Sequence, residues 1–188
     1  ERGWDKLAYI FQSPRLVPWR TALDNVLLGM ELRFEKRSTA MKERGISLLN
    51  MVGLQNDMDK YPAMLSGGER QRVSIARALS VDPDIILMDE PFSALDLNTR
   101  RRMRSEIIRI WQETGKTVIF VTHDIDEALV LADRILLLSN KPTRALETIT
   151  LDQPRPRVIE KTENLSRQKE HLISLFRTLE EQDKLEYA

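Results

Sequence analysis

The sequence predicts an α/β fold built around a parallel core sheet. Two strand-length runs, Ile85–Met88 and Thr117–Thr122, are largely apolar on both faces. Such runs are typical of strands that a parallel sheet buries on both sides. Longer segments with helical apolar spacing alternate with them, and this alternation indicates parallel strands joined by right-handed crossovers. The 188 residues are enough for one domain of this class.

The first part of the chain predicts one strand and three helices. Leu7–Phe11 has the composition of a short strand, and a loop that contains prolines, Ser13–Trp19, follows it. Thr21–Arg33 and Lys42–Val52 carry apolar residues at the spacing of an amphipathic helix. A third helix is expected over Ser66–Ser80, because a helix-capping pattern opens this segment.

The second part of the chain continues the alternation. Helices are predicted at Asn98–Thr114 and Asp124–Ala132, and a further strand of the parallel sheet at Arg134–Ser139. The apolar pattern then weakens. A polar connector, Gln153–Arg157, leads into a terminal amphipathic helix at Asn164–Glu181.

We expect one main domain with a C-terminal extension. The main domain covers residues 1–152 and contains a helical subdomain at about residues 20–80, and residues 153–188 form the connector and last helix. The chain begins at Glu1 without a methionine, inside the approach to the first strand. We therefore expect the N-terminal strands of the domain to be missing.

The composition excludes several functional classes. Twenty-nine basic residues balance twenty-nine acidic ones, so no net charge favours nucleic acid or an anionic membrane surface. The absence of cysteine excludes disulfides and thiolate metal sites and is compatible with a reducing cytosol. No apolar run approaches the roughly 20 residues of a membrane-spanning helix. No signal-peptide pattern opens the sequence.

The segment Leu65–Arg72 (LSGGERQR) carries the strongest single signal. Ser66 with Glu69 three residues later forms a capping box, which can start any helix. Gly67 and Gly68 inside the box favour a second interpretation, because backbone N–H groups without neighbouring Cβ atoms can approach an anion closely. The N-terminus of a helix also carries partial positive charge. The segment therefore indicates a phosphate-binding helix start.

Two adjacent acids, Asp89 and Glu90, follow the first apolar strand. Taken alone, such a pair is usually a pair of solvated loop acids. Here the pair stands at the carboxyl edge of a parallel sheet, where ligands of such folds bind. Because successive side chains of a strand point to opposite faces, Asp89 can hold Mg²⁺ while Glu90 polarises a water molecule.

Two further polar residues follow predicted strands. His123 comes after the second apolar strand, where an imidazole can contact a terminal phosphate, although a lone histidine there is more often a cap. Gln12 ends the first strand, where its amide oxygen can ligate a cation. His171 has no neighbour in the sequence that suggests chemistry.

In this order, the motifs closely resemble the ATP-binding cassette (ABC) family between about Leu7 and Ser139. The matching positions are Gln12 for the Q-loop, Leu65–Glu69 for the LSGGQ signature with Glu in the last place, Asp89–Glu90 for the Walker B pair, Ser93–Asp96 for the D-loop and His123 for the switch histidine. The resemblance implies a P-loop NTPase-like cassette in which two copies sandwich two ATP molecules. Hydrolysis then separates the dimer and drives a membrane partner.

The resemblance also implies the role of each candidate residue. Glu90 and His123 are expected to be catalytic. Gln12 and Asp89 are expected to hold Mg²⁺. The expected ATP-binding residues are Ser66, Gly67, Gly68, Glu69 and Asp96. The implied partners are a transmembrane permease, a second ABC subunit and, indirectly, a solute-binding protein, at the cytoplasmic face of the inner membrane and without nucleic acid.

One motif of the family is absent from the sequence. No G-x-x-x-x-G-K-[ST] phosphate-binding loop occurs, and the one Gly-Lys-Thr, Gly115–Thr117, lacks a glycine five residues upstream, where Ile110 stands. The motif also requires a strand before it and a helix after it, and here the predicted order is reversed. That loop supplies most phosphate contacts of such enzymes. We therefore expect the 188 residues alone neither to bind ATP tightly nor to hydrolyse it.

The segment after Gln12 narrows the resemblance to one importer type. Phe11–Val26 resembles the nitrate, sulfonate and taurine importer ATPases, and so does Leu151–Arg157. In that group the segment receives a coupling helix of the permease. Leu16, Pro18 and Trp19, if exposed, suit such a contact. The alternative is that Trp19 fills the local helical core.

Two other functional classes compete with an importer subunit. A soluble ABC ATPase acting on DNA or ribosomes is disfavoured, because no heptad-rich coiled coil separates Gln12 from Ser66 and no zinc-binding cysteines occur. A degenerate cassette with only a structural or regulatory role is disfavoured by the presence of Glu90 and His123.

Overall fold

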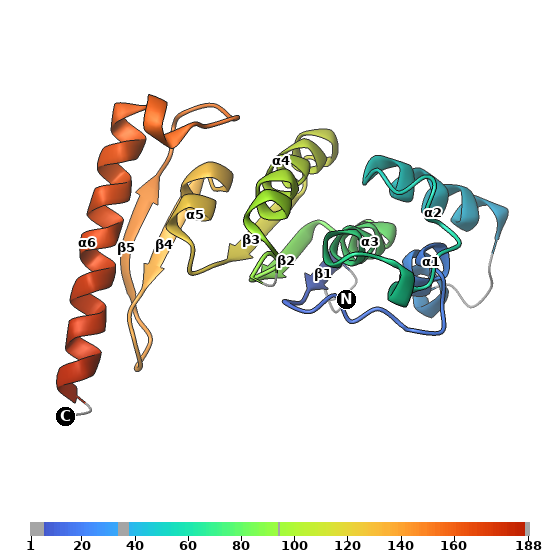
Figure 1. The fold of residues 1–188 in the computed structure, drawn as a ribbon, viewed down its shortest axis with the longest axis horizontal. Coiled ribbons are helices and arrows are strands. Elements are labelled where there is room, and N and C mark those ends of the chain that lie inside the picture. Colours follow the sequence, from blue (N-terminus) through green and yellow to red (C-terminus); the bar gives the residue numbers. More distant parts are fainter. Residues whose placement is uncertain (1–5, 34–37, 94, 187–188) are drawn as a thin grey trace. The chain divides into compact units, whose positions relative to one another are not determined.

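The computed structural model describes residues 6–33, 38–93 and 95–186, with only the backbone described for residues 180–186. The strands, α-helices and 3₁₀ helices (η) are shown in Figure 1. In chain order they are β1 (Leu7–Ile10), α1 (Ala22–Arg33), α2 (Thr39–Met51), η2 (Pro62–Met64), α3 (Gly67–Ser80), β2 (Ile85–Asp89), α4 (Leu97–Thr114), β3 (Thr117–Val121), α5 (Ile125–Leu131), β4 (Arg134–Leu138), β5 (Ala145–Thr150), η3 (Ile159–Lys161) and α6 (Glu163–Glu186). Several predicted boundaries coincide with these, and the others differ by a few residues.

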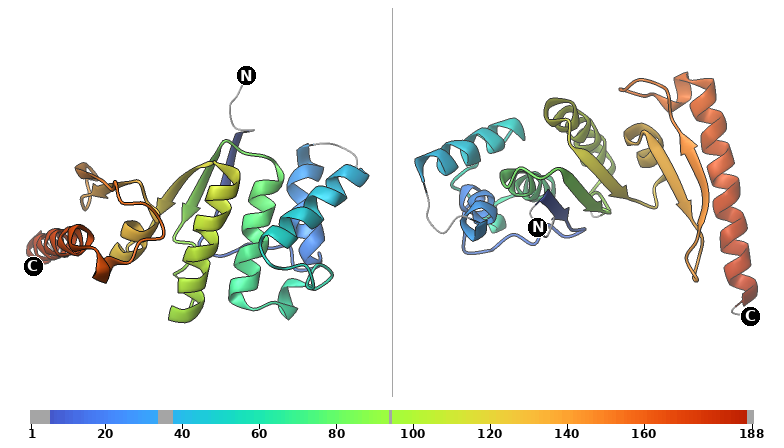
Figure 2. Two further views of the ribbon diagram at one scale, coloured as in Figure 1. Left: turned by 90° about the horizontal axis from the view of Figure 1, so that it is seen from above. Right: turned by 180° about the vertical axis from the view of Figure 1, so that it is seen from behind.

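Contacts divide the chain into two compact units, Glu1–Val121 and Thr122–Ala188. The first unit holds a three-stranded sheet in the order β1-β2-β3, in which both pairs of strands are parallel. The arrows of the three strands can be followed from behind in Figure 2. Leu7 pairs with Ile85, and Ile85 pairs with Thr117. The predicted parallel α/β core is therefore confirmed for this unit.

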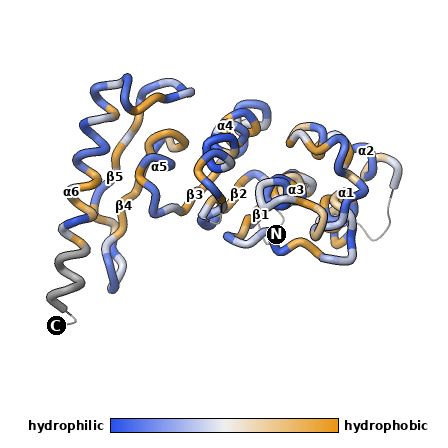
Figure 3. Tube along the Cα trace, in the orientation of Figure 1, coloured by the Kyte–Doolittle hydropathy of each residue, from blue (hydrophilic) through white to orange (hydrophobic). Residues whose placement is uncertain are grey.

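The two faces of this sheet differ in burial. Ile10 and Met88 are buried on one face, together with Ala8 and Ile86. On the other face, Tyr9 is 42% exposed and Ile119 is 50% exposed. The apolar colouring of β2 and β3 in Figure 3 therefore covers side chains that reach solvent as well as core.

Three helices of the first unit, α1, α2 and α3, pack against one another (Figure 1). Their contact faces follow the predicted helical spacing. The fully buried side chains include Val26 on α1, Leu49 on α2, and Val73 and Ile75 on α3. This packing fixes the start of α3 and the loop that precedes α1, the two segments that carry candidate site residues.

The second unit departs from the predicted sheet. The segment 134–139 was expected to join the parallel sheet, but β4 pairs antiparallel with β5, a strand that the sequence did not predict. The sequence of β5, ALETIT, gave no clear strand pattern, because only Ile149 of this strand is buried. This unit has a core of its own, formed by Leu129, Ile149, Leu151, Ile159, Leu165 and Leu172.

The predicted boundary after residue 152 does not separate two cores in this unit, because Leu129 and Ile149 pack in the same cluster as Leu165 and Leu172. Buried Arg157 lies in the predicted connector and donates to the carbonyl oxygens of Leu129 and Leu151, both at 3.1 Å. The division into a main domain and a C-terminal extension stays a prediction. No helix among the described residues is long and apolar enough to span a membrane.

Candidate functional site

The end of β2 presents the two acids that the sequence singled out. Asp89 is the last residue of the strand, and its carboxylate accepts a hydrogen bond of 2.9 Å from the hydroxyl of Tyr9. Tyr9 and Asp89 share the exposed face because Tyr9 pairs with Leu87, two residues before Asp89. The bond to Asp89 raises the pKa of the Tyr9 hydroxyl, because the phenol donates to the carboxylate.

Glu90 leaves the strand in an unusual backbone conformation. Its φ is +41°, a value that residues with a side chain rarely adopt, while its N–H still donates to Val121 O at 2.9 Å. The backbone N–H of Glu90 is therefore still bonded to the neighbouring strand, while its own φ angle is strained. Such conformations persist only where the surrounding structure determines them.

Gln12 reaches the acid pair from the end of β1. Its side-chain nitrogen donates to Glu90 Oε2 at 3.2 Å and to Ser93 Oγ at 3.0 Å. The Ser93 hydroxyl in turn donates to Glu90 O at 3.0 Å. Gln12, Glu90 and Ser93 thus form one polar cluster at the carboxyl edge of the sheet, and Ser93 is a member that had been noted only as part of the D-loop match.

The start of α3 forms the predicted capping box in full. The Ser66 hydroxyl oxygen accepts from Glu69 N at 3.3 Å, and Glu69 Oε2 accepts from Ser66 N at 2.7 Å. The bond from the Ser66 backbone lowers the pKa of the Glu69 carboxyl, because it favours the ionised form. The predicted box is therefore confirmed as a helix cap, and the phosphate-binding role of its residues stays a proposal.

The two glycines of the box have different surroundings. Gly67 is exposed, and a Cβ added there would lie 3.6 Å from Leu95. Gly68 is buried, and a Cβ added there would lie only 2.8 Å from Cγ2 of Thr99 on α4. Gly68 is therefore required for the close approach of α3 and α4, a packing reason that the sequence did not indicate.

The D-loop match leads into a second helix cap. Asp96 Oδ1 accepts from the backbone N–H groups of Asn98 at 3.0 Å and Thr99 at 3.1 Å, which makes it the N-cap of α4. Hydrogen bonding to Thr99 lowers the pKa of Asp96. Ala94, within the same motif, lies outside the described residues.

His123 belongs to the second unit, in the short segment between β3 and α5, and its side chain is exposed. Next to it, Thr122 donates to Glu127 Oε2 at 2.7 Å, and Asp124 caps α5 by accepting from Glu127 N at 3.0 Å. His171 contacts Glu147 at 2.9 Å on the surface of the same unit. The expected convergence of His123 with Glu90 stays a prediction.

Gly115–Thr117 follows a helix and leads into a strand, which confirms the predicted order, the reverse of the order in a phosphate-binding loop. Gly115 ends α4 with a φ of +62° and donates to Trp111 O, and Thr117 begins β3. Lys116 contacts Asp82 at 2.9 Å. The left-handed glycine is the usual C-terminal stop of a helix.

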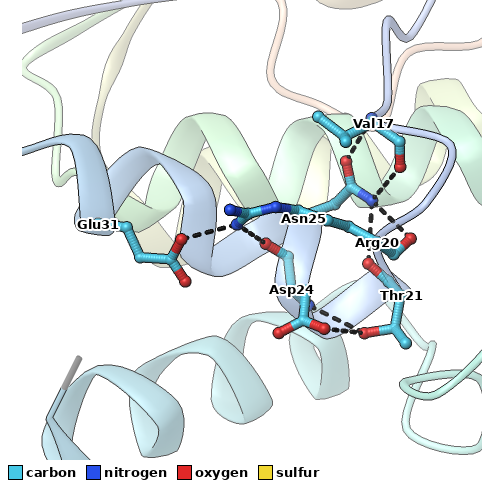
Figure 4. Close-up of polar contacts among 6 residues, drawn as sticks. All are labelled: Val17, Arg20, Thr21, Asp24, Asn25 and Glu31. Atoms are coloured by element: carbon cyan, nitrogen blue, oxygen red, sulfur yellow. Dashed lines mark hydrogen bonds and ion pairs between the residues drawn. The ribbon is translucent and has the colours of Figure 1, made fainter.

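The buried side-chain amide of Asn25 holds the loop after Gln12 in place through several hydrogen bonds, as Figure 4 shows. Asn25 accepts from Val17 N at 2.8 Å and donates to Val17 O at 3.1 Å, and it also donates to Arg20 O and Thr21 O. Arg20 contacts Glu31 at 2.7 Å. This network fixes the chain on both sides of the Pro18–Trp19 turn.

The fixed loop presents an apolar tip. Trp19 is 77% exposed, Pro18 is exposed and Leu16 is half-buried. The alternative in which Trp19 fills the helical core is therefore wrong. The exposed indole is the largest apolar side chain on this loop.

The oxygen atoms at the end of β2 suit a small, hard cation. Among the described residues, no group of three or more His, Cys, Asp or Glu side chains is arranged to hold a metal. Mg²⁺ does not require such a cage, since it usually binds one or two carboxylates together with phosphate oxygens and water. Asp89 supplies such a carboxylate at the end of β2, while Gln12 faces Glu90 and Ser93 with its side-chain nitrogen, so a cation-binding role of its amide oxygen stays a prediction.

Comparisons with known proteins agree with these motifs. A family model described as ABC transporter matches residues 4–93. The bicarbonate transport ATP-binding protein CmpD of Synechocystis is 44% identical over 160 residues, which are 84% of this chain and 56% of that protein. The taurine import ATP-binding protein TauB of Rhizobium johnstonii is 46% identical over 143 residues, which are 76% of this chain and 54% of that protein.

These matches identify an ABC transporter ATP-binding domain in the chain. The aliphatic sulfonates import ATP-binding protein SsuB 1 of Pseudomonas fluorescens is a further relative, 46% identical over 151 residues, 80% of this chain and 55% of that protein. The chain thus spans about half the length of the curated relatives it matches.

Solved structures support the ABC cassette fold. A dimeric ATP-binding cassette in a post-hydrolysis state, bound to ADP and Pi, matches with a TM-score of 0.60 and 38% identity over 70% of this chain and 58% of that one. The CbiO1 protein of Clostridium perfringens, described as part of an ABC transporter complex, matches with a TM-score of 0.64 and 26% identity, over 71% of this chain and 53% of that one.

The structure also identifies ABC-domain residues that the sequence did not single out. Tyr9 donates to Asp89, and Ser93 donates to the backbone of Glu90. Asn25 fixes the loop after Gln12, and Arg77 of α3 contacts the same loop. The pairing of Tyr9 with Leu87 is visible only once the strand register is known. The Arg77 contact spans more than sixty residues and has no local signal in the sequence.

Proposed function

We propose that this chain is part of the ATP-hydrolysing subunit of an ABC importer, which couples ATP binding and hydrolysis to the uptake of a small anion such as nitrate, a sulfonate or taurine. The contact between Gln12 and Glu90 carries the proposal, because it joins the loop after β1 to the acid that is expected to act on water. The names of the relatives, taurine, sulfonate and bicarbonate transport proteins among them, support the class of solute.

Glu90 acts as the general base. Its carboxylate lies at the carboxyl edge of the sheet, where the contact with Gln12 orients it without neutralising it. Asp89 and Gln12 hold Mg²⁺, which, when bound, offsets the negative charge of the ATP phosphates. Tyr9 keeps the Asp89 carboxylate directed toward the exposed face of the sheet. His123 contacts the terminal phosphate and helps to place the water.

The start of α3 serves the nucleotide of a second copy. Ser66 and Gly67 are exposed at a helix N-terminus, where the peptide dipoles favour an anion. Gly68 and Glu69 hold the shape of this start, and Asp96 holds the start of α4 beside it. A homodimer then places this surface against an ATP molecule bound mainly by the other subunit.

A phosphate-binding loop of the type G-x-x-x-x-G-K-[ST] is needed for activity and does not occur in these 188 residues. The test compares this chain with the full-length subunit in a Mg²⁺-dependent phosphate-release assay. We expect hydrolysis by the full-length subunit and none above background by the chain alone. Appreciable ATPase activity from the 188 residues would contradict this part of the proposal.

Leu16, Pro18 and Trp19 form the contact with the permease, at the cytoplasmic face of the inner membrane. The exposure of Trp19 and the rigid support of its loop by Asn25 favour this role. A large aromatic side chain in a fixed position is the kind of residue that dominates protein interfaces. A solute-binding protein joins the transporter indirectly, through the permease.

The permease contact is tested by Trp19→Ala in the full-length subunit, with its permease reconstituted in liposomes. We expect the variant to hydrolyse ATP without transport or to dissociate from the permease. Leu146→Ala is the matched control, because it removes an exposed apolar side chain from β5 of the second unit. Unchanged assembly and transport by Trp19→Ala would count against the contact.

A further inference from the structure

Arg77 lies on α3, the helix that begins at the signature motif, and it contacts the loop after Gln12. Its guanidinium donates to Pro14 O at 2.7 Å and to Arg15 O at 2.9 Å. Bonds from a charged donor are short and stronger than those between neutral groups. The planar fork of the side chain thus fixes two consecutive peptide groups of the loop.

The Arg77 side chain is half-buried, so its charge has lost part of its contact with water. Burial lowers the pKa of the Arg77 guanidinium, because the charged form loses hydration. A buried charge is retained only where hydrogen bonds satisfy it. The bonds that satisfy Arg77 here include the two that it donates to loop carbonyls, so the loop and the helix depend on each other.

The loop takes a conformation that it would not favour alone. Arg15 has a φ of +45°, in the left-handed region that side-chain-bearing residues rarely adopt, and its guanidinium stacks 4.0 Å from the ring centre of Phe11. Such strained residues persist where surrounding contacts determine the backbone. Arg77 holds the carbonyl of this residue and of the one before it.

Two anchors therefore fix the segment between Gln12 and Trp19. Arg77 holds Pro14 and Arg15 from α3, and Asn25 holds Val17 from α1. Only Ser13 separates Gln12 from the anchored Pro14, and Gln12 donates to Glu90 at 3.2 Å.

We propose that Arg77 is a positioning residue that fixes the loop after Gln12 to α3 and so sets the contact of Gln12 with Glu90. The inference rests on the proposed ATPase function only for its effect on catalysis. The fixing of the loop is a property of the fold and is tested separately from activity.

The first test measures amide hydrogen exchange at Val17 and Arg20 in the full-length protein, since both N–H groups are bonded within the loop region. Arg77→Lys keeps the charge but loses the two-pronged donor. We expect exchange at these amides to become at least about tenfold faster, as the loop opens more often. Arg77→Gln, which keeps a smaller donor, gives the same result if the lysine variant does not fold.

Arg44→Lys is the matched control. Arg44 of α2 also donates to two backbone carbonyls, Leu79 O at 3.3 Å and Ser80 O at 3.1 Å, but these carbonyls belong to the last turn of α3 and not to the loop after Gln12. We expect it to leave exchange at Val17 and Arg20 unchanged. Equal exchange in wild type and Arg77→Lys, or an equal rise in Arg44→Lys, overturns the inference.

The second test measures ATP hydrolysis by the same proteins. Arg77→Lys is expected to lower kcat several-fold and to leave the KM for ATP unchanged, because Arg77 acts on Gln12 and not on the nucleotide. An unchanged kcat in a variant whose loop exchange has risen overturns the positioning role. If the wild-type protein is folded and does not hydrolyse ATP, the proposed function fails, and the exchange measurement still decides whether Arg77 fixes the loop.

Discussion

The start of α3 and the end of β2 hold their candidate side chains in opposite ways. At α3, Ser66 and Glu69 bond each other's backbone within one helical turn. At β2, Asp89 and Glu90 are bonded by Tyr9 and Gln12, which lie 80 and 78 residues earlier in the chain. The first arrangement is encoded by four consecutive residues, and the second exists only after β1 and β2 have paired.

This difference between local and long-range bonds determines how each site responds to changes elsewhere in the fold. A capping box forms wherever its helix forms, so the start of α3 keeps its geometry with little help from the rest of the fold. The carboxylates of β2 take their orientation from distant partners, so a change of packing alters them directly. We therefore expect substitutions at the start of α3 to lower stability as well as to affect the proposed nucleotide contact, and substitutions at the end of β2 to act mainly on activity.

The largest expected effect is that of Glu90→Gln in the full-length subunit. Loss of a general base lowers kcat by roughly 10²- to 10⁴-fold. The amide keeps the size of the side chain and an oxygen that can still accept from Gln12, so the fold and the KM for ATP should change little. Steady-state phosphate release measures the effect.

Asp84→Asn is the control for Glu90→Gln, because Asp84 is a carboxylate just before the other end of β2, paired with Lys6 at 3.1 Å. It should leave kcat unchanged. A near-wild-type kcat in Glu90→Gln would contradict the difference between the two regions, because Glu90 at the end of β2 would then not act as a general base.

The second effect concerns the packing of α3 on α4. Gly68→Ala places a Cβ at 2.8 Å from Thr99 Cγ2, and such overpacking costs about 1–3 kcal/mol of unfolding free energy. Gly67→Ala is the matched control, because its Cβ meets Leu95 at an ordinary 3.6 Å. Denaturant unfolding of the full-length protein compares the two.

A rescue variant sharpens this second prediction. Thr99→Ser removes the clashing methyl group and keeps the hydroxyl and the N–H that bonds Asp96. It should restore much of the stability that Gly68→Ala loses. Equal stability of Gly67→Ala and Gly68→Ala would show that the close approach of the two helices is unimportant.

Most of the fold could be predicted because its elements have strong local patterns. The buried strand Ile85–Asp89 and the helix Gly67–Ser80 were both expected, since an apolar run and a capping box are properties of neighbouring residues. The strand Ala145–Thr150 was missed because it buries a single side chain in an antiparallel pair. The error in the partner of β4 followed from this omission.

The sequence allowed the reactive residues of the candidate site to be predicted, but not the residues that contact and orient them. Asp89 and Glu90 were found from their place after an apolar strand, but Tyr9 was not, because its bond to Asp89 depends on the register of β1 against β2. Arg77 was missed for the same reason, since its carbonyl partners lie more than sixty residues away. Gly68 was noted, but the methyl group of Thr99 that requires it could not be foreseen.

The third effect is the loss of one helix cap. Ser66→Ala removes the acceptor for Glu69 N and should cost about 1 kcal/mol of unfolding free energy. Ser66→Thr keeps the hydroxyl and should be close to wild type. Chemical denaturation of both variants measures the difference. A loss in Ser66→Thr as large as in Ser66→Ala would mean that the cap bond does not stabilise α3.

The smallest effect is the pH dependence of the same cap. Because the Ser66 backbone lowers the pKa of Glu69, the ionised carboxylate stabilises the folded state. This contribution is complete above the ordinary glutamate pKa and is lost as the pH falls through the lowered value. Glu69→Gln keeps an acceptor without the charge, so its stability deficit relative to wild type should shrink in acid. Unfolding midpoints measured from neutral pH downward test this, and a deficit that is constant or grows in acid would mean that the charge of Glu69 does not support the start of α3.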